Sequence, residues 1–402
     1  MLASSEARQQ IFATMQTFGT ERVDLARAAG RILRESVRAE RDQPPFDRVT
    51  MDGIAVRRDA VEAGRRSFAV RGRCHAGDES APLDDPDGCM EVMTGAVLPP
   101  GTDCVIPVER LRVADGAAEL EPGYAPEAGQ FVHRRGSDHA ADTLLINEGA
   151  RIAPVDVAVI ASCGMQTVEV AARPVLRLLS TGNELVAAGR PIAAHQIRLS
   201  NGPAIAAMLG AEGFVGTTQE HLRDDPDALE QRIGAHLQEA DVLVLSGGVS
   251  MGKADFVPAI LDGLGVKKVF HKVAQRPGKP LWFGRGPRGQ SVFALPGNPV
   301  SSIVCCRQYL LPALIHASGG QPREAVAVRL AEALDFAPQL TCFLPVRLVH
   351  GDDAVVDAVP VPTNTSGDFA ALSGTDGYVE LDADTEHFAR GRIVPFHGWD
   401  AA

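Results

Sequence analysis

The 402-residue chain has few aromatic residues and no excess of positive charge. Phe, Trp and Tyr make up 5% of it, which argues against the stacked aromatic platforms that bind single-stranded nucleic acid. Its 51 acidic residues outnumber the 39 basic ones, for a formal net charge of −12, whereas non-specific nucleic-acid binding requires the opposite sign. We therefore expect no nucleic-acid partner. An anionic ligand would need local positive groups, such as backbone N–H groups, helix N-termini and a few Lys or Arg side chains.

Paired cysteine motifs and clustered histidines are also lacking. The seven cysteines are odd in number and include no CxxC pair, so we expect buried thiols rather than a disulfide framework or a zinc ribbon. The eleven histidines show neither HxxH nor HExxH spacing, which argues against a histidine-based metal centre.

The sequence has no long, uninterrupted apolar run. The best candidate, residues 301–315, is broken by Arg307 and Gln308, and a membrane-spanning helix needs about 18 or more apolar residues. Glu6 and Arg8 stand where a signal peptide has its apolar core. We expect a cytoplasmic protein that does not contact a membrane.

Residue patterns change along the chain. Ile11, Met15 and Phe18 have helical spacing, and we expect helix over most of the first 40 residues, including a second helix at 23–37. Between 173 and 320, continuous apolar runs, one of them at 213–219, alternate with helical stretches, as in a parallel sheet covered on both faces. The predicted fold is multi-domain α/β plus β, with an N-terminal helical/linker domain (1–43 plus 136–172), a β-rich inserted domain (44–135), a central parallel or mixed α/β domain (173–320) and a small C-terminal β domain (321–402).

Three glycine-bearing turns follow predicted strands of the α/β domain, at 178–185, 242–255 and 293–302. Ligands of open parallel sheets bind outside the carboxyl ends of the strands, and small residues there let backbone N–H groups approach an anion. Tight turns that hold no ligand are the alternative. The residues expected to bind an anionic substrate are Ser180, Thr181, Gly182, Ser246, Gly247, Gly248, Ser250, Pro296, Gly297, Asn298 and Pro299.

Acidic residues accompany these turns, and a basic segment follows them. Glu184, Asp224, Asp225 and Asp255 would repel a phosphate unless a divalent cation lies between them, so we expect Mg²⁺. Solvated loop charges or helix caps are the alternative for each acid. The basic counterpart, which could also be an ordinary solvated loop, is formed by Lys272, Arg276 and Lys279.

Seven ordered segments together resemble one family, the molybdopterin molybdenumtransferases that include MoeA and the gephyrin E-domain. The resemblance is strong through residue 320 and weaker beyond it. The segments are PPFDRVTMDGIAV (44–56), MTGAVLPPGTDCVIPVE (93–109), RRGSD (134–138), STGNEL (180–185), SGGVSMGKADF (246–256), RPGKPLWFG (276–284) and LPGNPVSS (295–302).

The resemblance implies an activity and an assembly. Adenylylated molybdopterin and molybdate would give molybdenum cofactor and AMP, with Mg²⁺, in a homodimer. The active site would lie between the molybdopterin-binding α/β domain of one subunit and the β-rich domain of the other. The molybdopterin adenylyltransferase and molybdoenzymes are expected as further partners.

The resemblance also assigns roles to single residues. It implies that Glu184, Asp225 and Asp255 are catalytic and bind the metal, and it favours Asp225 over Asp224. Further catalytic residues would come from the other side of the cleft, and Arg134 and Arg135 would bind substrate there. These further catalytic residues are Asp52, Thr94 and Asp138.

Two residues depart from the family pattern. Arg276 stands where many relatives have Lys, and His133 stands where Arg is common. The C-terminal domain also lacks several of the family's usual motifs. Two other functions stay open: a scaffold protein of the same fold with weak catalysis, and molybdopterin adenylylation.

Overall fold

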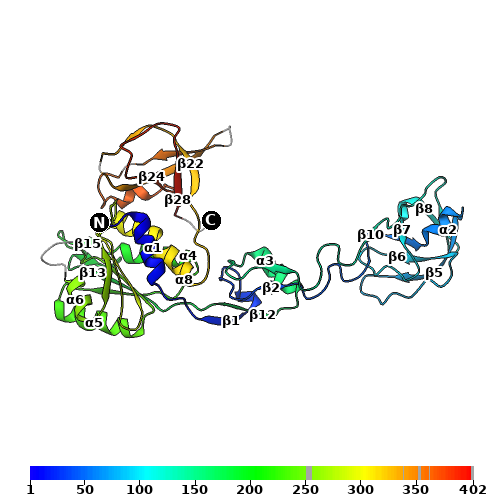
Figure 1. Ribbon diagram of the computed structural model, residues 1–402, viewed down its shortest axis with the longest axis horizontal. Helices are drawn as coiled ribbons and strands as arrows, with labels where there is room; N and C mark the ends of the chain where they lie inside the picture. The colour runs from blue at the N-terminus through cyan, green and yellow to red at the C-terminus, as the bar shows by residue number, and fades with distance from the viewer. Residues whose placement is uncertain (250–255, 338, 352–354, 362, 400–402) are drawn as a thin grey trace. The chain divides into compact units, whose positions relative to one another are not determined.

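The computed structural model describes residues 1–249, 256–337, 339–351, 355–361 and 363–399. The chain forms two compact units (Figure 1). Unit 1 comprises Met1–Glu35, Glu148–Pro154 and Thr167–Ala402, and unit 2 comprises Ser36–Asn147 and Val155–Gln166.

A six-stranded mixed sheet forms the centre of unit 1, in the order β16-β13-β17-β21-β20-β18. The first four strands are parallel and the last two antiparallel. The predicted α/β class is thereby confirmed, although the strand expected at 213–219 begins five residues later. The strands are β13 (Leu176–Thr181), β16 (Thr218–Leu222), β17 (Val242–Ser246), β18 (Lys267–His271), β20 (Trp282–Arg285) and β21 (Ser291–Leu295).

Helices cover both faces of this sheet (Figure 1). Leu178 and Val244 pack in the cluster that contains α1 (Ser4–Thr14), α4 (Asn201–Ala211) and α8 (Leu311–Ala317). The alternate residues Leu179 and Leu243 pack with α5 (Pro226–Glu239) and α6 (Val257–Gly263). Successive strand residues point to opposite faces, so continuous apolar runs are what a doubly covered sheet requires.

One helical stretch of unit 1 is long and apolar enough to cross a membrane by length and composition. It runs from Pro299 to Ala317, and 83% of its 18-residue apolar window is buried within the fold. It consists of α7 (Pro299–Cys305), a π-helical turn at Cys306–Leu310, and α8. Arg307 lies in the π-helical turn and donates from Nε to Gly398 O at 2.6 Å. These contacts are those of a core helix.

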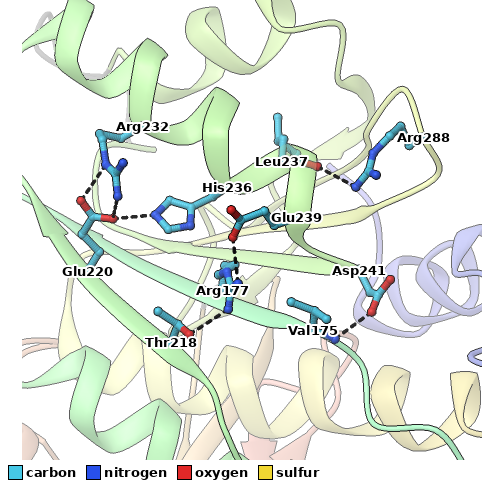
Figure 2. A network of polar contacts seen from close by, with 10 residues as sticks. All are labelled: Val175, Arg177, Thr218, Glu220, Arg232, His236, Leu237, Glu239, Asp241 and Arg288. Atoms are coloured by element: carbon cyan, nitrogen blue, oxygen red, sulfur yellow. Dashed lines mark hydrogen bonds and ion pairs between the residues drawn. The ribbon is translucent and has the colours of Figure 1, made fainter.

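A polar network fixes the β16 edge of the sheet against α5. Glu220 accepts from Arg232 Nε at 2.8 Å and lies 2.6 Å from His236 Nε2. Arg177 donates to Thr218 and Glu239 at 2.8 and 2.9 Å. Figure 2 shows these ion pairs side by side between the strands and the helix. They fix the position of α5, which begins directly after the acidic pair Asp224 and Asp225.

The C-terminal part of unit 1 is a small closed barrel, as the predicted β domain requires. Its sheet order is β24-β25-β22-β28-β26, and an additional β24–β26 pairing closes the ring. A short strand of the α/β domain, β19 (Gln275–Arg276), pairs in parallel with β24. The barrel strands are β22 (Val326–Leu330), β24 (Thr341–His350), β25 (Val356–Pro360), β26 (Gly377–Leu381) and β28 (Ile393–Gly398).

The helix predicted at 23–37 is wrong. Residues 20–24 form β1 (Thr20–Asp24), which pairs antiparallel with β12 (Thr167–Ala171). A single 3₁₀ turn (Leu25–Arg27) follows, and Gly30 has φ of +80° and donates its N–H to Ile152 O. Pairing with strands more than a hundred residues away overrides the local apolar spacing, because tertiary packing commonly outweighs intrinsic propensity.

Unit 2 contains a six-stranded sheet in the order β7-β4-β6-β5-β9-β8. Apolar clusters cover both of its faces. The helix α3 (Pro154–Ser162) lies almost wholly in this unit as well. The sheet strands are β4 (Gly53–Val56), β5 (Ser67–Cys74), β6 (Gly88–Val92), β7 (Cys104–Pro107), β8 (Leu111–Ala114) and β9 (Ala117–Leu120). Its smaller elements are β2 (Val37–Arg38), β3 (Arg48–Val49), β10 (Val132–His133), β11 (Leu144–Ile146) and α2 (Arg58–Glu62).

All seven cysteines are buried free thiols, which confirms that expectation. Burial raises the pKa of Cys89 and of Cys104 to about 12. Because the thiolate is the reactive form, these residues serve packing rather than chemistry.

Candidate active site

The three glycine-bearing turns meet at one cavity of about 1080 Å³ in unit 1. Ser180 is the register partner of Ser246, and Ser246 is the register partner of Leu295, so β13, β17 and β21 end side by side. The parallel register is what brings together segments more than a hundred residues apart. The cavity-lining residues of the α/β domain include Ser180, Thr181, Gly182, Glu184, Asn201, Asp224, Ser246, Gly247, Gly248, Arg276, Lys279, Pro296, Gly297, Asn298 and Pro299.

Glycine is required in the turn after β17. Gly247 has φ of +100°, and a Cβ there would lie 2.6 Å from Thr181 O. Gly248 has φ of +67°, and a Cβ there would lie 2.8 Å from Val257 Cγ2. Both backbone conformations disfavour other residues, and close contact with the first turn leaves no room for side chains. Ser250 and Asp255 lie outside the described residues.

Two buried polar atoms in this cavity have no hydrogen-bond partner among the residues that the structure describes. They are Thr181 Oγ1 and Asn201 Oδ1. Asn201 Nδ2 donates to Ser246 Oγ at 2.9 Å and to Gly297 O at 2.8 Å, and these two bonds fix the orientation of the amide. Unsatisfied buried polar groups are rare and often mark a ligand site.

Sequence reasoning missed Asn201. The residue is the first of α4, where Ser200, Asn201 and Pro203 form a helix start. That signal predicts only a helix N-terminus. Its position between the second and third turns comes from the tertiary fold.

The acidic residues differ from the prediction at one position. Glu184 and Asp224 line the cavity, and Asp224 exchanges two 3.2 Å hydrogen bonds with Asn183. Asp225 instead caps α5, since its Oδ1 accepts from Ala228 N at 2.8 Å. The strand ends at Leu222 and the helix begins at Pro226, and this spacing turns Asp224 toward the cavity and makes Asp225 the cap.

Two carboxylates suit a magnesium ion that is shared with a phosphorylated ligand. Mg²⁺ is commonly bound by one or two carboxylates together with substrate phosphates and water. The carboxylate of Glu184 lies close over the backbone of Gly182, where a Cβ would be 2.7 Å from Glu184 Oε2. Within the described ranges, no group of three or more His, Cys, Asp or Glu residues could form a protein-only cage.

The basic segment reaches the cavity with Arg276 and Lys279, whereas Lys272 is not among the lining residues. Lys272 has φ of +75°, and its N–H donates to Leu281 O. Of the three predicted cations, the structure therefore brings two to the cavity.

Within this segment, Gln275 is fully buried at the base of the cavity lining. Its side chain accepts from the Tyr309 hydroxyl and donates to Pro277 O at 2.9 Å. Tyr309 in turn contacts Ser4 Oγ at 2.9 Å. Burial, more than any other cause, raises the pKa of Tyr309, so the hydroxyl keeps the proton that it donates. This buried chain holds the loop that carries Arg276 and Lys279.

The remaining predicted residues lie in unit 2. Asp52 Oδ1 accepts from Thr94 N at 2.6 Å and from Thr94 Oγ1 at 2.8 Å, and these bonds hold the pKa of Asp52 below its usual range. Asp138 Oδ1 lies 2.9 Å from His133 Nε2, whose other ring nitrogen lies 3.0 Å from Arg48 Nη2. An Arg can only donate, so in this arrangement Nε2 of the imidazole carries the proton and donates to Asp138.

The two arginines of RRGSD are paired with carboxylates. Arg134 lies 2.5 Å from Asp47, and Arg135 lies 2.8 Å from Asp42. Both side chains are more than half exposed. Their predicted substrate contacts stay a prediction.

Three family profiles together span most of the chain. "MoeA N-terminal region (domain I and II)" matches residues 2–164, "Probable molybdopterin binding domain" matches 177–316, and "MoeA C-terminal region (domain IV)" matches 327–399. The molybdopterin molybdenumtransferase of Synechocystis sp. is 38% identical over 400 residues, covering 99% of this chain and 100% of that protein.

The chain belongs to the molybdopterin molybdenumtransferase family. A second member, from Synechococcus elongatus, is 35% identical over 384 residues and covers 93% of each chain. Among solved structures, the molybdopterin biosynthesis MoeA protein from Pyrococcus horikosii is similar with a TM-score of 0.84 and 29% identity, covering all of both chains. The family resemblance of the seven motifs is thereby confirmed, and a profile also matches residues 327–399 of the C-terminal barrel, where the resemblance is weaker.

Proposed function

We propose that this chain is a molybdenum insertase that transfers molybdenum from molybdate into adenylylated molybdopterin and releases AMP. One observation carries the proposal: three glycine turns, three cations (Arg198, Arg276 and Lys279) and two carboxylates line a single cavity in a member of the molybdopterin molybdenumtransferase family. Its volume of about 1080 Å³ is at the upper end of small-molecule sites. A dinucleotide-sized substrate suits it better than a simple oxyanion alone.

The cavity residues divide the work of binding such a substrate. Gly182 N–H and Gly247 N–H already donate to Leu222 O and Leu295 O at 3.2 Å, so other backbone N–H groups of the three turns would donate to phosphoanhydride oxygens. Arg276 and Lys279 supply positive charge to the same oxygens or to molybdate. Catalysis would then be positioning and charge stabilisation, as in other reactions at phosphorus.

Magnesium belongs to the proposal as the cofactor. Glu184 and Asp224 would hold Mg²⁺ together with substrate phosphate oxygens, and Asp255 remains a third expected ligand from the resemblance. The ion would neutralise phosphoanhydride charge beside the carboxylates. Without it, the negative carboxylates would repel the substrate that the turns bind.

The assembly and cellular setting are proposed on the resemblance. In a cytoplasmic homodimer, Asp52, Thr94 and Asp138 of one subunit would complete the cavity of the other. The adenylyltransferase that supplies the substrate and the molybdoenzymes that receive the product are the proposed partners. The scaffold alternative is less well supported, since a pure scaffold has no need for Glu184, Asp224, Arg276 and Lys279 at one cavity.

The test is a turnover assay with the purified full-length chain. Adenylylated molybdopterin, molybdate and Mg²⁺ are incubated with it, and AMP and molybdenum cofactor are quantified. We expect both products to form in equal amounts and to depend on Mg²⁺. Absence of AMP with all three components present would overturn the insertase proposal in favour of the scaffold.

A further inference from the structure

The cavity has a second wall that comes entirely from the C-terminal part of unit 1. Its described lining residues include Phe336, Leu340, Leu344 and Phe369, together with small hydroxyl residues such as Thr365. Among the described residues of this wall none is charged. The α/β wall opposite carries Arg276, Lys279, Glu184 and Asp224. One cavity therefore has a charged, glycine-rich side and a neutral, largely apolar side.

The C-terminal wall is anchored to the ligand-binding turns. Ser366 O accepts from Val300 N at 3.1 Å, and Ser366 Oγ accepts from Asn298 Nδ2 at 2.6 Å. Arg276 pairs with Cys342 in the β19–β24 ladder. Beneath the wall, Val300 packs in one buried cluster with Phe343. The wall is thus fixed to the third turn and to the basic segment, and it forms part of the same site.

Phe369 presents an aromatic ring that the fold itself does not bury. It is 45% exposed, although it lines the cavity, and it begins a 3₁₀ turn (Phe369–Leu372). Phe336 is half-buried at the edge of the barrel core. Covering an exposed aromatic ring with a flat apolar group stabilises the complex. A phosphate or molybdate ion cannot cover the ring in this way.

We propose that this C-terminal wall is the subsite for a flat heteroaromatic ring of the substrate, with Phe369 as its principal contact. The inference rests on the proposed function, because an adenylylated pterin joins two such rings through a charged phosphoanhydride. The charged wall holds the anhydride, and the neutral wall holds one ring. Adenine and the pterin share this chemistry, and binding experiments distinguish them.

Affinity measurements with Phe369 variants test the proposal. We expect Phe369→Ala to weaken binding of adenylylated molybdopterin about tenfold, since base–aromatic stacking typically contributes that much. Phe369→Tyr keeps the ring and is expected to bind within about twofold of the wild type. Ile393→Ala is the matched control, because Ile393 is 60% exposed on β28 and is not among the cavity-lining residues.

Separate ligands identify the ring. AMP, molybdopterin and inorganic pyrophosphate are titrated against the wild type and Phe369→Ala. Weakening of AMP alone assigns adenine, weakening of molybdopterin alone assigns the pterin, and both results support the subsite. Pyrophosphate, which has no ring, is expected to bind both proteins equally.

Three outcomes would overturn the subsite. They are unchanged affinity for every ring-bearing ligand, an equal loss for pyrophosphate, and a lower sedimenting mass for Phe369→Ala with unchanged affinity, which would make the wall a contact between copies of the chain. Failure of the proposed function looks different, since the wild type itself would then bind no adenylylated molybdopterin and release no AMP.

Discussion

The charged groups of the unit 1 cavity and those of the unit 2 motifs are organised in opposite ways. Arg134 and Arg135 of unit 2 each form an ion pair with an aspartate of the same unit. Among the described residues, Arg276 and Lys279 at the cavity form no such ion pair. Charge that is already neutralised holds loops together, whereas unpaired charge around a cavity is available to a ligand. The comparison separates groups expected to control activity from groups expected to control stability.

The largest effect is expected at Gly247, where a substitution should reduce both activity and stability. Gly247→Ala places a Cβ 2.6 Å from Thr181 O at φ of +100°, so we expect AMP release to be abolished and the free energy of unfolding to fall by about 2–4 kcal/mol. Turnover assays and urea unfolding measure the two quantities. Gly263→Ala is the control, because a Cβ at that helical glycine contacts nothing within 4 Å. Normal turnover by Gly247→Ala would remove the turn from the site.

A second test removes two of the positive charges that line the cavity. The double variant Arg276→Gln, Lys279→Gln is expected to lower kcat/KM about 100-fold while changing the free energy of unfolding by less than about 0.5 kcal/mol. Lys267→Gln, on β18 outside the cavity lining, is the control for loss of one positive charge. Arg135→Gln removes a paired cation instead. If it lowers kcat/KM as strongly, the distinction between paired and unpaired cations is wrong.

The adjacent aspartates Asp224 and Asp225 allow the effects on activity and on stability to be separated at neighbouring positions. Asp224→Ala is expected to lower turnover at least tenfold with little effect on unfolding, because Asp224 lines the cavity. Asp225→Ala removes the cap of α5 and is expected to cost about 1 kcal/mol of stability with nearly normal turnover. The opposite result would restore Asp225, which the family resemblance favours, as the functional residue.

The smallest effect on activity is expected from Glu220, which lies at the centre of β16 and is not among the cavity-lining residues. Hydrogen bonds from Arg232, only partly opposed by burial, and then from His236 lower the pKa of Glu220 to about 2. A depressed folded-state pKa stabilises the fold above the unfolded-state value of about 4.3, and this stabilisation is lost as pH falls toward 2.

Glu220→Gln tests that network (Figure 2). We expect it to cost about 1–2 kcal/mol of unfolding free energy at pH 7 and to flatten the fall in stability between about pH 4.5 and pH 2. Turnover at pH 7 should stay within about twofold of the wild type. Thermal unfolding across that pH range provides the measurement, and an unchanged acid profile would contradict the assigned ion pairs.

Sequence reasoning succeeds here where the signal is local. The Gly247–Gly248 turn follows an apolar strand directly, and its position at a strand end needs only the rule for parallel sheets. The segment 20–38 shows the reverse case, because β1 pairs with β12 across almost 150 residues and apolar spacing alone indicated a helix.

Site residues that depend on distant contacts could not be predicted. Asn201 lies between two turns that are 45 and 96 residues further along the chain. Asp224 and Asp225 are adjacent, and only the observed strand end and helix start decide which one lines the cavity. The neutral wall with Phe369 comes from a barrel whose sequence shows only short strands, so its place beside the glycine turns required the structure.

Arg276 lines the cavity and also belongs to the sheet of the C-terminal barrel, because β19 pairs in parallel with β24. A ligand that contacts the Arg276 guanidinium therefore binds only protein molecules in which β24 is folded into the barrel. By thermodynamic linkage, substrate at 100 times its Kd should stabilise the barrel by about 2.7 kcal/mol against local unfolding. Amide hydrogen exchange in the far part of β24, residues 346–350, would then report occupancy of a cavity that those residues do not line.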